Sequence, residues 1–121
     1  MKKCIIADDA RVVRMVSAKI LENLGFEVTE VEDGEEALEE LEDGLPDLLM
    51  LDWKMPVVDG IDVMRQVKQM EDGDKVKIIF CSAVCDLEKI QSVLDEGADD
   101  YIIKPFDFDI IQSKLTILGL L

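Results

Sequence analysis

The sequence predicts an α/β protein with a doubly wound parallel sheet and helices on both sides. Short apolar runs alternate with longer segments of helical periodicity five times along the 121 residues. The longer segments supply the crossovers that parallel strands require. Glycine or proline separates most segments, and 49% of the residues are hydrophobic, which is enough for a packed core.

The first two strand–helix units are predicted in the first third of the chain. Lys3–Ala7 is a short apolar strand, and Arg11–Leu24 is a helix that Gly25 ends. The apolar residues of this helix at helical spacing are Val13, Val16, Ile20 and Leu24. Phe26–Val31 is the least apolar strand, so we expect it at a sheet edge. The helix over Gly34–Leu41 has an apolar face of Ala37, Leu38 and Leu41.

The third strand is predicted over Leu48–Leu51, which is apolar enough to be covered on both faces. The Asp59–Gly60 pair marks the loop that follows it. The helix after this loop has Ile61, Met64 and Val67 at helical spacing, and Gly73 ends that region. Lys77–Cys81 is the fourth strand.

The last two helices and the fifth strand are predicted between residues 87 and 118. The helix Leu87–Glu96 is expected to pack Leu87, Ile90 and Leu94 inward, and Gly97 caps it. Tyr101–Ile103 is the fifth strand. The helix Asp107–Leu118 is expected to pack Ile111, Leu115 and Leu118 inward.

Composition excludes several classes of function. The net charge of −15 disfavours nucleic-acid binding, because the surface repels phosphate backbones. The absence of histidine removes the commonest nitrogen ligand of zinc and iron, and any Ser-His or Cys-His catalytic pair. No apolar run is long enough to span a bilayer. We expect one cytoplasmic domain over residues 1–121, with no output domain and no membrane contact.

Polar side chains follow four of the five predicted strands. Asp8 and Asp9 follow the first strand, Asp52 the third, Ser82 the fourth and Lys104 the fifth. Ligands of open α/β sheets bind outside the carboxyl ends of the strands. We therefore expect these side chains to converge on one rim of the sheet.

Each of these residues also has a simpler interpretation. Asp8 or Asp9 could cap the first helix, and Asp52 could be an ordinary loop carboxylate. Ser82 could be a turn residue, and Lys104 a solvated surface lysine. All four interpretations would have to hold at four strand ends, which favours a common site.

Three carboxylates in one pocket repel one another. Two unit charges about 4 Å apart cost about 4 kcal/mol at an effective dielectric of 20. A hard divalent cation relieves this repulsion, and carboxylates with water suit Mg²⁺. An aspartate, a metal, a lysine and a hydroxyl together favour phosphoryl transfer.

The chain resembles the receiver domains of bacterial response regulators, and most closely the stand-alone chemotaxis regulators of the CheY type. The resemblance covers the whole chain and depends on four motifs in the family's order and spacing: IIADDARVVR, LLMLDWKMPVVDG, IIFCSA and GADDYIIKPF. It implies the flavodoxin-like strand order 2-1-3-4-5.

The resemblance also implies roles for individual residues. Asp52 would accept a phosphoryl group from a histidine kinase, and Lys104, after a cis Lys104–Pro105 bond, would bind that group. Ser82 would be the switch hydroxyl, and Tyr101 the aromatic that moves inward, unless it is an ordinary edge-strand aromatic. The implied Mg²⁺ ligands are Asp9, Asp52 and the backbone carbonyl of Lys54, with Asp8 acting through water.

For output, the resemblance implies a protein effector that binds the surface of the fourth helix, fifth strand and fifth helix. We expect a monomeric switch in chemotaxis signalling. We do not expect it to be an enzyme, apart from its own phosphorylation and dephosphorylation. One alternative is a phosphate sink that binds no effector. A Mg²⁺-dependent aspartyl-phosphate hydrolase is disfavoured, because such phosphatases commonly have a second aspartate where Lys54 stands.

Overall fold

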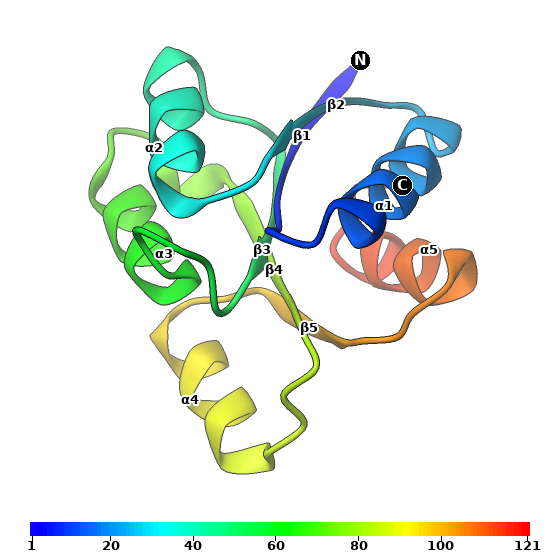
Figure 1. Cartoon of the computed structure of the whole chain (residues 1–121). Helices are drawn as coiled ribbons and strands as arrows, with labels where there is room; N and C mark the ends of the chain where they lie inside the picture. The colour runs from blue at the N-terminus through cyan, green and yellow to red at the C-terminus, as the bar shows by residue number, and fades with distance from the viewer.

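The computed structural model describes all 121 residues and contains one five-stranded parallel sheet. Its strand order is β2-β1-β3-β4-β5, so the order implied by the resemblance is confirmed (Figure 1). The chain winds from β1 outward to β2 and then passes β1 to reach β3, so the strand order reverses between β1 and β3. The strands are β1 (Lys2–Ala7), β2 (Phe26–Val31), β3 (Leu48–Asp52), β4 (Lys77–Ser82) and β5 (Asp100–Ile103).

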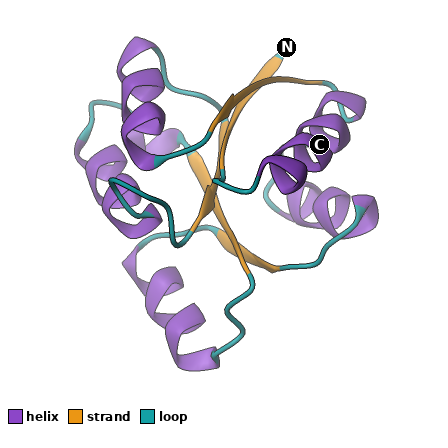
Figure 2. Cartoon of the chain, in the orientation of Figure 1, coloured by secondary structure: helices purple, strands orange, loops and turns teal.

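Five α-helices cover the two faces of the sheet (Figure 2). Helices α2, α3 and α4 lie on one face, and α1 and α5 lie on the other. None of these helices combines the length and the apolar character needed to cross a membrane. The helices are α1 (Arg11–Asn23), α2 (Gly34–Asp43), α3 (Gly60–Gln69), α4 (Leu87–Glu96) and α5 (Phe108–Ile117).

The two faces of the sheet form two separate hydrophobic cores. Successive side chains of a strand point to opposite faces, so Leu49 and Leu51 of β3 join the core under α2, α3 and α4. Leu48 and Met50 join the core under α1 and α5. All four side chains are buried, which confirms the prediction of a strand covered on both faces.

Most predicted elements are confirmed to within a few residues. β2 is an edge strand as expected, and α4 has its predicted bounds. Several elements differ from the prediction at their ends: β1 begins at Lys2, and α2 continues to Asp43. The short 3-10 helix η1 (Gly73–Lys75) was not predicted.

One residue of the predicted apolar face was wrong in each of two helices, α1 and α4. Val16 of α1 is 48% exposed, and the helix instead buries Ser17, Ala18 and Leu21 against the sheet. Small residues at 17 and 18 allow the helix to approach the strands closely, so the larger valine is turned outward. Leu87, predicted to face inward, is 79% exposed, and Val93 is the residue that α4 buries.

Candidate functional site

The carboxyl ends of β1 and β3 bring three aspartates together. Asp8 and Asp9 follow β1, and Asp52 is the last residue of β3. One oxygen from each carboxylate lies within 4.8 Å of the others. Asp8 is buried, Asp52 is partly buried and Asp9 is exposed, so the cluster opens to solvent on the Asp9 side. The predicted convergence of the three carboxylates is therefore observed.

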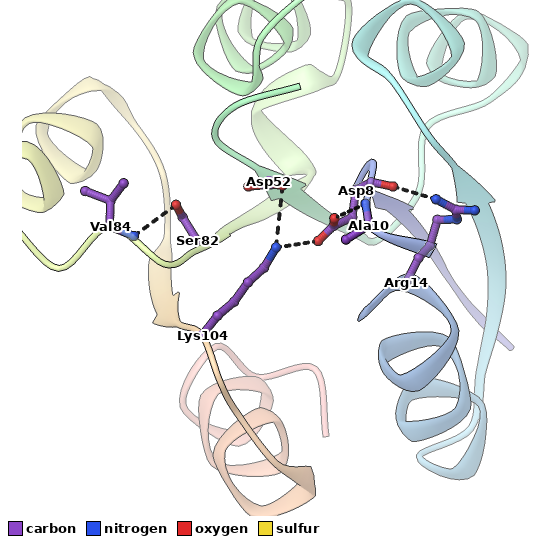
Figure 3. Close-up of polar contacts among 7 residues, drawn as sticks. All are labelled: Asp8, Ala10, Arg14, Asp52, Ser82, Val84 and Lys104. Carbon is purple, nitrogen blue, oxygen red and sulfur yellow. Dashed lines mark hydrogen bonds and ion pairs between the residues drawn. The ribbon is translucent and has the colours of Figure 1, made fainter. Parts of the chain in front are cut away.

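Asp8 does not cap α1, which was the simpler interpretation of this pair. The residue at the N-cap of α1 is Ala10, and no side chain caps the helix. One oxygen of Asp8, Oδ1, accepts a hydrogen bond from the N–H of Ala10 at 2.8 Å. The other oxygen, Oδ2, accepts one from the Nζ of Lys104 at 2.8 Å (Figure 3). Both oxygens of this buried carboxylate are thus held in place.

The environment of Asp52 disfavours its charge. Burial, followed by repulsion from Asp8, raises its pKa to about 6 from an ordinary value of 3.8, and the nearby Lys104 offsets part of this rise. The rise therefore comes first from the loss of hydration around the carboxylate and second from its repulsion by the neighbouring carboxylate. A carboxylate with this pKa is still mostly ionised at pH 7.

The start of α3 fixes the backbone of Asp52. A Cβ atom on Gly60 would lie 2.3 Å from the carbonyl oxygen of Asp52, so only glycine allows this approach. The N–H of Gly60 donates to the carbonyl of Trp53 at 2.8 Å, which closes the loop between β3 and α3. Lys54 lies exposed in this loop, and its carbonyl accepts no hydrogen bond from the chain.

Lys104 enters the site from the end of β5. The Lys104–Pro105 bond is cis, as the resemblance implied. The Nζ of Lys104 is 2.8 Å from Asp8 Oδ2 and 3.5 Å from Asp52 Oδ2. Burial alone would lower the pKa of Lys104, but the hydrogen bond that Lys104 donates to Asp8 and the charges of both aspartates raise it. The shorter contact to Asp8 was not anticipated from the sequence.

Ser82 and Tyr101 meet at the backbone of Val84, which sequence reasoning did not identify as a link between them. The Oγ of buried Ser82 accepts a hydrogen bond from the N–H of Val84 at 3.2 Å. The hydroxyl of Tyr101 donates to the carbonyl of Val84 at 2.9 Å. The ring of Tyr101 is only 6% exposed and meets Trp53 edge-on, with ring centroids 6.3 Å apart. In this structure Tyr101 is an inward-packed aromatic.

The donor set fits a hard divalent cation. Carboxylate oxygens are the preferred ligands of such ions, and three of them converge here from two strands. The pKa of Asp52 is raised by burial and then by repulsion from Asp8, so additional positive charge at the cluster would favour the ionised carboxylate. A divalent cation would supply that charge, and it would be held by residues of the Asp8, Asp9 and Asp52 cluster.

Comparison with known proteins identifies the family of the chain. The family model described as the response regulator receiver domain matches residues 4–116. The chemotaxis protein CheY of Bacillus subtilis is 38% identical, with 93% of each chain covered. The phosphate regulon transcriptional regulatory protein PhoB of Rhizobium meliloti is 36% identical over 95% of this chain, which spans 51% of that relative.

Two solved structures illustrate the structural similarity. The chemotaxis response regulator CheY4 of Vibrio cholerae superposes with a TM-score of 0.89 at 26% identity, covering 100% of this chain and 99% of that one. The receiver domain of the sensor histidine kinase PA1611 from Pseudomonas aeruginosa has a TM-score of 0.87 at 29% identity, with 98% of each chain covered. That receiver domain was crystallised with a magnesium ion coordinated in its active site cleft.

Proposed function

This chain belongs to the response regulator receiver domain family, and from this premise we propose that it is a signalling switch phosphorylated on Asp52. The observation that supports the proposal is the convergence of Asp8, Asp9 and Asp52 with Lys104 at one rim of the sheet. The phosphoryl donor would be a phosphohistidine of a histidine kinase. The cellular context would be a two-component pathway, most specifically chemotaxis, in the cytoplasm.

In the proposed reaction, an Oδ atom of Asp52 forms a bond to phosphorus while the bond from phosphorus to the histidine nitrogen of the donor breaks. The electron pair of that bond returns to the imidazole nitrogen, which takes up a proton. Lys104 lies 3.5 Å from Asp52 Oδ2, close enough to turn from Asp8 to an oxygen of the new phosphoryl group. Its charge would offset the negative charge that Asp52 acquires.

The metal of the proposed site is Mg²⁺. Its ligands would be Asp9, Asp52 and the backbone carbonyl of Lys54, with Asp8 acting through water. When bound, Mg²⁺ supplies charge neutralisation for the phosphoryl oxygens. Asp8 already has both oxygens hydrogen-bonded within the protein, which suits a residue that acts on the metal indirectly.

The proposed output depends on Ser82 and Tyr101. Phosphorylation adds about 1.5 to 2 negative charges to the site. The Ser82 hydroxyl would then donate to a phosphoryl oxygen, which would pull on the Val84 backbone that Tyr101 also contacts. The surface of α4, β5 and α5 would change shape for a protein effector. We propose that residues 1–121 act as a monomer whose only chemistry is its own phosphorylation and dephosphorylation.

A phosphate sink, which accepts the phosphoryl group but binds no effector, has the same site and differs only in lacking a partner. The experiment that tests the shared chemistry is incubation of the metal-free protein with acetyl phosphate, with and without Mg²⁺, followed by mass spectrometry. We expect one added phosphoryl group per chain in the presence of Mg²⁺ and none in Asp52→Asn.

A matched control is Asp74→Asn, which removes an exposed aspartate from η1, far along the chain from the site. This variant should be phosphorylated like the wild type. In NMR spectra with beryllofluoride and Mg²⁺, the amide signals of Asp52, Ser82 and Tyr101 should shift. Phosphorylation that persists in Asp52→Asn would refute the assignment of the phosphoacceptor.

A further inference from the structure

We propose that Arg14 is a positioning residue that holds the turn between Asp8 and Asp9 in the arrangement that binds a divalent cation. This inference rests on the proposed function of the site. Arg14 lies on α1, and nothing in its sequence position marks it as different from Arg11 in the same helix. Only the tertiary structure separates the two arginines.

The side chain of Arg14 joins three elements. Its Nη1 donates a hydrogen bond of 2.7 Å to the backbone carbonyl of Asp8 (Figure 3). Its Nε lies 3.5 Å from Oε1 of Glu30 on β2. The Arg14 side chain is only 13% exposed, so these contacts lie largely away from solvent. A single guanidinium therefore ties α1 to the β1–α1 turn and to the edge strand.

The contact to Asp8 controls the position of Asp9. The carbonyl of Asp8 and the N–H of Asp9 belong to one planar peptide group, so holding the carbonyl fixes the plane from which Asp9 starts. The exposed carboxylate of Asp9 hydrogen-bonds to no other residue, and α1 begins without a side-chain cap. The orientation of Asp9 thus depends on the backbone that Arg14 holds.

The sign of the effect on metal affinity separates positioning from simple electrostatics. A cation near three carboxylates opposes binding of a second cation, so removing the charge of Arg14 should strengthen Mg²⁺ binding if charge alone mattered. Loss of positioning acts in the opposite direction, because the ligands must then be ordered when the metal binds.

The test is a Mg²⁺ titration of the full chain, followed by the fluorescence of Trp53, the only tryptophan and the neighbour of Asp52. We expect Arg14→Met to weaken Mg²⁺ binding by about tenfold, as is usual when a group that orients a metal ligand is removed. Arg14→Lys keeps the charge but loses the planar fork, and we expect an intermediate loss. Arg11→Met is the matched control, because Arg11 is exposed, and its affinity should equal or exceed that of the wild type.

A second measurement needs no metal. In EDTA, amide hydrogen exchange at Asp9 and Ala10 should be faster in Arg14→Met than in the wild type or Arg11→Met. If the wild type binds no Mg²⁺, the proposed function fails, yet this exchange still tests the hold of Arg14 on the turn. Unchanged exchange in Arg14→Met, or Mg²⁺ affinity equal to or above that of the wild type, would overturn the inference. If Arg14→Met does not fold, Arg14→Lys is judged by the same two outcomes.

Discussion

Helices α3 and α4 have the same length and lie on the same face of the sheet, yet they are held very differently. Each has ten residues. Helix α3 buries four of them, Gly60, Val63, Met64 and Val67, whereas α4 buries only Val93. Ile90 and Leu94 of α4 pack against the same core but are only partly buried. Because buried apolar area is the main source of stability, α3 is anchored more firmly to the domain than α4.

The difference matches the roles of the loops that precede the two helices. Helix α3 begins with Gly60, whose backbone lies directly against the carbonyl of Asp52. Helix α4 follows a loop that contains Val84, the residue linked to both Ser82 and Tyr101, and its first residue, Leu87, is 79% exposed. The proposed phosphoacceptor thus stands beside the more firmly anchored helix, and the proposed switch residues stand beside the less firmly anchored one.

The largest expected effect on this comparison is that of Met64→Ala in α3. Met64 is fully buried, so we expect the free energy of unfolding to fall by about 3 kcal/mol. Urea denaturation followed by circular dichroism measures this value. A loss near zero would mean that α3 is no better anchored than α4.

A second prediction concerns the charge beside the more firmly anchored helix. Because the folded state raises the pKa of Asp52 from 3.8 to about 6, ionising Asp52 opposes folding. This destabilisation of the folded state is absent below pH 3.8, grows as the pH rises from 3.8 to about 6, and is complete above that range. In EDTA at pH 8 we expect Asp52→Asn to be more stable than the wild type by about 1.5 kcal/mol, after allowance for solvent screening.

The pH dependence provides the control for this prediction. At pH 5 the advantage of Asp52→Asn should shrink to about half, because the folded wild type is then largely protonated at this position. Saturating Mg²⁺ at pH 8 should stabilise the wild type and reverse part of the difference. Equal unfolding free energies of the two proteins at pH 8 in EDTA would contradict the conclusion that the ionised carboxylate of Asp52 destabilises the folded state.

Val93→Ala in α4 should cost less than Met64→Ala, about 1 kcal/mol. Since Val93 is the only buried residue of the helix, we expect its loss to release α4 locally and not to unfold the whole domain. Amide hydrogen exchange should then become fast throughout α4 while the amides of α3 stay protected. Equal protection of both helices in this variant would show that α4 is anchored by contacts other than Val93.

The smallest effect is expected for the one direct polar link between the two helices. Arg65 of α3 donates two hydrogen bonds, of 2.9 and 2.7 Å, to the carboxylate of Glu96 at the end of α4. This contact lowers the pKa of Glu96, but both side chains are at the surface. We expect Arg65→Met to leave the unfolding free energy unchanged and to speed hydrogen exchange only in the last turn of α4. Arg65→Met combined with Glu96→Gln should behave like either single variant.

The sequence by itself determined the fold class and the identity of the polar residues at the rim. Strand and helix periods are local properties, so the alternation of elements and the edge position of β2 could be predicted from short segments. The positions of Asp8, Asp9 and Asp52 at strand ends then followed, because parallel strands end at one edge of the sheet.

Tertiary structure alone decided which residues contact one another. Lys104 lies 96 positions from Asp8 in the chain, and its preference for Asp8 over Asp52 depends on the packing of three strands. The inward faces of α1 and α4, the link through Val84 and the hold of Arg14 on Asp8 also depend on how closely helices approach the sheet. Local periodicity says which residues are apolar or charged, but only close packing selects among several equally spaced candidates.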